Sequence, residues 1–258
     1  MAKKKSGKKS HPLYRFIRFM VWVVFPKYTL EGTENLPEEP AVLIGNHSKA
    51  NGPVALQLYN PRESYTWCIS QMMHCKEVPA YAFEDFWSGK PKYTLWMYKL
   101  LSYLIAPLAS FIMTNANTIG VYRDKRILRT FLESVERMQE GADVVIFPEC
   151  YTEHNNIVHE FQRGFVELAR LNYKKTKKST PFVPMYVCPS LKKLVFGKPV
   201  YYNTEADPKE EADRICNELM AAISEMAYAQ PRHKVVTYNN IRKKYYPENV
   251  REDEKETL

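Results

Sequence analysis

Two short polar stretches in this 258-residue chain contain residue types that can do acid–base chemistry. The first, GNHS (45–48), follows the apolar run AVLIGN (41–46), and His47 can accept a proton near neutral pH. The second, FPE (147–149), ends the apolar run ADVVIFPE (142–149), and Glu149 could orient a base or bind a hydroxyl. Each stretch alone also fits a structural role, as a hydrogen-bonded loop histidine or a glutamate that caps a turn.

Two further signals stand at the ends of predicted strands. Arg123 follows TIGVY (118–122), where an arginine suits bidentate hydrogen bonding to a phosphate or an ion pair with Asp124. The run PFVPMYVCP (181–189) carries an internal proline, which alone indicates only an edge strand or a bulge. None of these signals decides a function by itself.

The elements that must position these residues alternate between strands and helices. Strands are predicted at 28–32, 41–46, 64–70, 118–122, 142–149, 181–189 and 193–202. Helices are predicted at 52–59, 125–141, 160–176 and 207–229, the last with Asp207 as its N-cap. This alternation predicts an α/β fold, with a mixed, largely parallel sheet flanked by helices on both faces. In such sheets functional residues gather just beyond the strand ends.

Three segments do not fit that alternation. Residues 13–26 (LYRFIRFMVWVVFP) are too short to span a bilayer but suit a helix lying at a membrane surface, with a core-packing helix as the alternative. Residues 100–113 are predicted to form a buried helix, with a membrane-dipping helix as the alternative. Residues 72–94 show no clear period, and we interpret them as an irregular excursion, a lid or the wall of a substrate tunnel.

The composition limits the class of protein. The formal net charge of +8 favours anionic partners, and the lysine-rich start beside an apolar aromatic segment favours phospholipid over nucleic acid. The five cysteines have no zinc-site spacing, and His154 with His159 is weak evidence for a metal, so we expect no metal. We expect a disordered basic tail (1–12), an amphipathic anchoring helix (13–26), one catalytic domain (27–229) and a charged peripheral C-terminal segment (230–258).

The order and spacing of the four signals together are more specific than any one of them. They resemble the glycerolipid acyltransferase family, which includes the 1-acylglycerol-3-phosphate acyltransferases. Asn46-His47, Arg123, Phe147-Pro148-Glu149 and Val183-Pro184 stand in the order of the family's motifs, and FQRG (161–164) is similar to a further family segment. The resemblance covers roughly residues 28 to 200.

The chain departs from the family pattern at the catalytic acid. The family's aspartate falls at position 52, where this chain has Gly52, and the family's glycine after Phe-Pro-Glu is Cys150. Another carboxylate could replace the aspartate, Glu149 first and Asp124 or Asp85 less readily, or Asn51 or a backbone carbonyl could orient the ring.

The resemblance implies an O-acyltransferase of phospholipid synthesis. It moves a fatty acyl group from acyl-CoA or acyl carrier protein to a lysophospholipid hydroxyl, needs no cofactor, and works at the cytoplasmic face of a membrane as a peripheral or monotopic protein. The resemblance implies His47 and Glu149 as catalytic residues, and a substrate-binding set of Asn46, Asn51, Arg123, Pro148 and Arg163. The alternative is a weak or inactive member that binds lipid or acyl carrier at the membrane.

Overall fold

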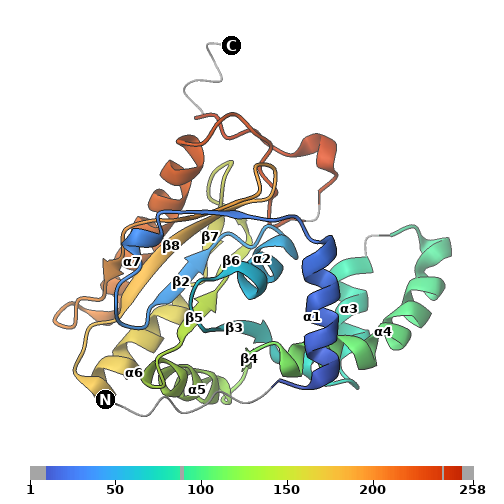
Figure 1. The fold of residues 1–258 in the computed structure, drawn as a ribbon, viewed down its shortest axis with the longest axis horizontal. Coiled ribbons are helices and arrows are strands. Elements are labelled where there is room, and N and C mark those ends of the chain that lie inside the picture. Colours follow the sequence, from blue (N-terminus) through green and yellow to red (C-terminus); the bar gives the residue numbers. More distant parts are fainter. Residues whose placement is uncertain (1–9, 88–89, 240, 252–258) are drawn as a thin grey trace. The chain divides into compact units, whose positions relative to one another are not determined.

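The computed structural model describes residues 10–87, 90–239 and 241–251, so most of the predicted basic tail lies outside it. The chain, traced in Figure 1, divides into two compact units. One unit contains residues 1–24 and 65–133, and the other contains residues 25–64 and 134–258. The predicted domain bounds stay a prediction.

The larger unit is built on a mixed sheet with the strand order β1-β9-β8-β2-β5, and β10 also pairs with β8. The strands are β1 (Thr29–Glu31), β2 (Val42–Gly45), β5 (Asp143–Ile146), β8 (Pro181–Cys188), β9 (Lys193–Phe196) and β10 (Val200–Tyr201). Strand β2 lies parallel to β8 and β5, and Ile44 aligns with Pro184 on one side and Ile146 on the other. The carboxyl ends of β2 and β5 therefore share one edge, which brings the segments after them together.

Helices cover both faces of this sheet. Strand β8 is buried along its whole length, and its side chains alternate between the two faces. On one face, Val183, Met185 and Val187 share a core with α2 (Asn51–Tyr59). On the other, the ring of Phe182 contacts Phe165, and β8 packs against α7 (Pro208–Tyr228). The structure confirms the predicted fold class.

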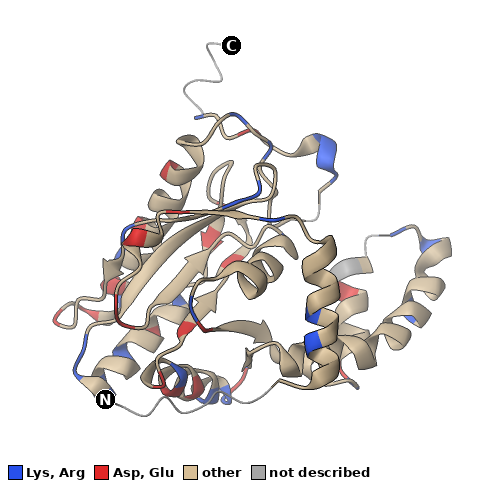
Figure 2. Cartoon of the chain, in the orientation of Figure 1, with Lys and Arg blue, Asp and Glu red and all other residues tan. Residues whose placement is uncertain are grey.

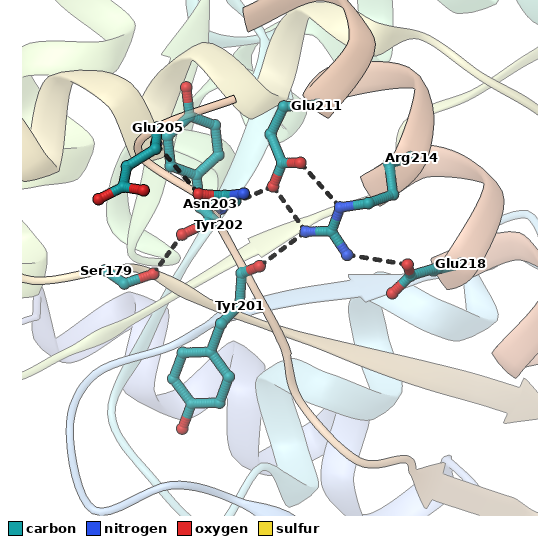
Figure 3. Close-up of polar contacts among 8 residues, drawn as sticks. All are labelled: Ser179, Tyr201, Tyr202, Asn203, Glu205, Glu211, Arg214 and Glu218. Carbon is teal, nitrogen blue, oxygen red and sulfur yellow. Dashed lines mark hydrogen bonds and ion pairs between the residues drawn. The ribbon is translucent and has the colours of Figure 1, made fainter. Parts of the chain in front are cut away.

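The amino end of α7 is fixed to the sheet by a polar network (Figure 3). Asp207 caps the helix as predicted, because its side chain accepts the backbone N–H groups of Lys209 and Glu210. Glu211 accepts hydrogen bonds from Arg214 and from the Asn203 backbone N–H. Burial raises the pKa of Glu211, but these hydrogen bonds outweigh it and leave the pKa below its ordinary value.

The predicted helix 160–176 is wrong in its first third. Strands β6 (Glu149–Glu153) and β7 (His159–Phe161) form an antiparallel hairpin there, followed by a 3-10 turn (Arg163–Val166) and helix α6 (Glu167–Thr176). His159 and Phe161 are buried while Glu160 between them is not, a period of two that is typical of a strand.

The smaller unit contains the parallel pair β3 (Ser64–Ile69) and β4 (Thr118–Val121), with helices α1 (Pro12–Val24), α3 (Val78–Ala82) and α4 (Leu95–Asn115). Helix α5 (Ile127–Gln139) begins here and ends in the larger unit. The excursion 72–94 is more regular than expected, because it contains α3, a π-helical turn (Phe83–Trp87) and a 3-10 turn (Lys92–Thr94).

The burial predicted for residues 100–113 is wrong. Helix α4 exposes Leu100, Tyr103, Leu104 and Leu108, and residues 92–115 are long and apolar enough to cross a membrane by length and composition. Helix α1 is in contact with α4 and exposes Leu13, Phe16, Phe19, Met20, Trp22, Val23 and Val24, so it is not a core-packing helix. A soluble protein rarely exposes so large an apolar surface without a partner.

Candidate active site

His47 lies in a loop that follows β2 and is held tightly to the neighbouring strand. Asn46, before it, is 1% exposed, and its side-chain amide donates to the Val187 carbonyl at 3.1 Å and accepts the Val187 N–H at 2.7 Å. The same amide donates to Ser48 Oγ at 2.9 Å. The Asn46 amide is thus used within the fold and positions the histidine loop, and its predicted binding of substrate stays a prediction.

The backbone after His47 has an unusual conformation. Ser48 and Lys49 both have positive φ values, 45° and 56°, in the left-handed region that costs roughly 1–2 kcal/mol per non-glycine residue. The Asn51 side-chain amide donates to the Ser48 carbonyl at 3.0 Å and helps to hold this turn at the start of α2. Such strain persists only where surrounding contacts hold it, and it gathers at functional sites. Asn51 therefore holds the turn.

Glu149 joins the histidine loop to the β6–β7 hairpin. One carboxylate oxygen accepts the His47 backbone N–H at 2.6 Å, and the other accepts the His159 backbone N–H at 3.0 Å. Burial raises the pKa of Glu149 to about 7, although both hydrogen bonds oppose this shift. Both oxygens thus accept backbone N–H groups, so Glu149 positions the histidine loop, and its catalytic role stays a prediction.

No space remains at position 52 for the aspartate of the family pattern. A Cβ atom on Gly52 would lie 2.7 Å from the His47 carbonyl oxygen and 3.0 Å from the Phe147 ring. Phe147 instead contacts the His47 ring edge to face, with the ring centroids 5.2 Å apart. Position 52 thus has no carboxylate, and the Phe147 ring packs beside it and against His47.

The C-terminal segment is not peripheral along its described part, which corrects the expectation for 230–258. His233 and Val235 are buried, and Tyr238 contacts the His47 ring edge to face with centroids 5.9 Å apart. Ser48 Oγ also donates to the Val236 carbonyl at 3.4 Å. No sequence pattern indicated this contact, because Tyr238 stands in a charged stretch without a motif.

The remaining predicted substrate-binding residues are Pro148, Arg163 and Arg123. Pro148 is buried, and its carbonyl accepts the Gln162 N–H. Arg163 is exposed and forms an ion pair with Asp213, whose hydrogen bond raises the pKa of Arg163. Arg123 is exposed just after β4 in the smaller unit.

The other acid–base candidates are engaged elsewhere. Asp124 pairs with Arg126 within the smaller unit, and the Asp85 side chain lies outside the described residues. His154 pairs with Glu160 at 3.1 Å, whereas His159 is buried against Tyr238, with ring centroids 5.8 Å apart.

Comparison with known proteins shows a likeness to acyltransferases. Residues 84–188, less than half of the chain, match the acyltransferase family model. This part of the chain is therefore similar to that family. The matched residues include Arg123, Glu149 and Arg163 but begin after His47, so the role of His47 rests on the geometry above. No curated protein sequence matches the chain.

The fold of this chain is similar to a solved structure. The crystal structure of the 1-acyl-sn-glycerophosphate acyltransferase PlsC from Thermotoga maritima aligns with a TM-score of 0.50 and 13% identity. The alignment covers 85% of this chain and 79% of that one. The likeness extends beyond the 84–188 match and supports the same fold.

Proposed function

We propose that this acyltransferase transfers a fatty acyl group from acyl-CoA or acyl carrier protein to a lysophospholipid hydroxyl, with His47 as the general base. The main support is the position of His47 at the carboxyl edge of the sheet. Its backbone is held by Glu149, and its ring is packed between Phe147 and Tyr238. A base must be held in a fixed position before its proton transfer is efficient.

The proposed reaction proceeds by attack of the lysophospholipid oxygen on the thioester carbonyl carbon. His47 takes the hydroxyl proton as the new C–O bond forms, the C–S bond then breaks, and the imidazolium returns the proton to the leaving thiolate. The products are a phospholipid ester and a free thiol. Arg123 remains our proposed ligand for the acceptor phosphate, because an exposed guanidinium suits bidentate binding.

The membrane is the proposed source of the acceptor. The apolar side chains exposed on α1 and α4 support a peripheral or monotopic protein, and we propose the cytoplasmic face of the membrane. Nucleic acid is not a proposed partner, and we propose that the reaction needs no cofactor.

A second proposal is a weak or inactive acyltransferase-fold protein that binds lipid or acyl carrier. The observation that favours it is Gly52, together with the packing that leaves no space for a carboxylate there. In serine proteases, loss of the carboxylate beside the histidine lowers kcat by about 10⁴.

One assay separates the two proposals. Thiol release from acyl-CoA is measured with a panel of lysophospholipids, for the wild type and for His47→Ala. An enzyme gives release that depends on the acceptor and is lost in His47→Ala. The control is His154→Ala, since His154 pairs with Glu160 and should leave the rate unchanged. Equal release by wild type and His47→Ala would remove His47 as the base, and lipid binding without release would favour the binding protein.

A further inference from the structure

A loop of the C-terminal segment, described over residues 236–239 and 241–246, is anchored at both ends. At its base the Val235 N–H donates to the Pro247 carbonyl at 2.8 Å, and the His233 N–H donates to the Asn249 side chain at 2.7 Å. The Asn249 amide also donates to the Ala227 carbonyl at the end of α7. The loop is therefore fixed to the larger unit where it begins and ends.

Both arms of the loop lie against the histidine loop. The outgoing arm brings Tyr238 to the His47 ring. The returning arm buries Tyr246, and the Lys49 ammonium lies 5.3 Å from the centre of its ring. Lys49 is only two residues from His47, so both arms contact the histidine loop. The tip of the loop, residues 241–245, lies between these two contacts in the sequence.

The tip itself points outward and combines positive charge with apolar surface. Arg242, Lys243 and Lys244 are consecutive and exposed, and Figure 2 shows the basic residues gathered on this turn. Exposed Ile241 and Tyr245 flank them, and Tyr245 is 63% exposed. Among the described residues, the three cations take part in none of the ion pairs with acidic side chains.

We infer that the tip, residues 241–245, docks on an anionic phospholipid surface. Three cations suit the negative headgroups, while an aliphatic and a tyrosine side chain suit the boundary between headgroups and acyl chains. This contact belongs to the larger unit, whereas the exposed apolar faces of α1 and α4 belong to the smaller one. It would place the surface that supplies the acceptor next to the loop that holds His47. The inference deepens the proposed function and rests on it for the identity of the acceptor.

The test measures binding of the full chain to vesicles, without turnover. The vesicles are phosphatidylcholine alone or phosphatidylcholine mixed with phosphatidylglycerol. Amide hydrogen exchange across residues 236–246 should slow only with the mixed vesicles. The triple variant Arg242→Gln, Lys243→Gln, Lys244→Gln should lose this protection. Its partition coefficient onto the mixed vesicles should fall roughly 100-fold, since each cation contributes about fivefold. The loss should be smaller in high salt, which screens the charges.

A matched control removes three exposed lysines, two in the last turn of helix α6 and one just beyond its carboxyl end. The variant Lys174→Gln, Lys175→Gln, Lys178→Gln changes the net charge equally and should keep both the partition and the loop protection. Equal losses in both triple variants would show general charge attraction and overturn the inference.

Two other outcomes would also overturn it. Unchanged partition and protection in the tip variant would show that the tip does not touch the membrane. A raised KM for acyl-CoA with unchanged vesicle partition would assign the tip to the acyl donor. Because vesicle binding is measured without catalysis, failure of this inference is distinct from failure of His47→Ala to abolish thiol release.

Discussion

Restoring the family's aspartate by Gly52→Asp should damage this protein. Motif comparison alone predicts a gain, because a carboxylate beside the catalytic histidine raises kcat in other enzymes. The structure predicts the opposite, since any Cβ at position 52 lies 2.7 Å from the His47 carbonyl oxygen and 3.0 Å from the Phe147 ring. To relieve that contact, the backbone of the proposed base itself must move.

The expected size follows from packing. Forcing extra atoms into a filled site costs roughly 1–3 kcal/mol, and a carboxylate in the first turn of α2 regains at most about 1 kcal/mol from the helix dipole. Gly52→Ala adds the same Cβ without the charge, so both variants should lose stability and transferase rate. The Phe147→Ala change should relieve only the ring contact and should not rescue either variant.

The measurements are the urea unfolding midpoint and the thiol-release rate. Gly164 is the matched control, because a Cβ there meets nothing within 4 Å, and Gly164→Ala should leave both quantities nearly unchanged. If Gly52→Asp unfolds at the wild-type urea concentration and has a higher kcat, the packing argument is refuted, and the resemblance alone would have been the better guide.

Four further predictions concern the groups around His47 and α7. Glu149→Gln should lower the free energy of unfolding by about 1–3 kcal/mol, because the amide NH2 group would face a backbone N–H that now donates to the carboxylate. Full transferase activity in this variant would remove Glu149 from its positioning role. The pKa of Glu149 is about 7 in the folded state against an ordinary 4.5, so between these pH values the folded state keeps a proton that the unfolded state has lost. The stability of the wild type should therefore fall by roughly 3 kcal/mol as the pH rises from 4.5 to 7. In urea titrations, Glu149→Gln should flatten this dependence on pH. Glu211 has the opposite sign, because its lowered pKa gives stability above pH 4.5 that is lost on acidification, and Arg214→Met should reduce that loss. Tyr238→Ala should lower kcat about 2- to 10-fold, since an aromatic pair contributes about 0.5–1.5 kcal/mol, whereas Tyr238→Phe should retain the wild-type kcat. Equal rates in the two variants would show that the ring has no role.

Local sequence patterns determined most of the fold. The apolar runs that became β2, β5 and β8 are visible because a strand buried on both faces needs a continuous apolar segment. Helix α7 is visible from its Asp207 cap and following proline. His47 and Glu149 could be placed near one another because the carboxyl ends of parallel strands share an edge.

The roles of individual side chains were decided only by the tertiary structure. Glu149 accepts hydrogen bonds from two backbone N–H groups, and the Asn46 amide bonds to strand β8, because hydrogen-bond partners depend on which strand lies alongside. The exposure of one face of α4 depends on which elements pack against the helix, and the hydrophobic pattern of its sequence does not show this. The contact of Tyr238 with His47 joins residues 191 positions apart, and that distance in sequence is bridged only when the chain folds.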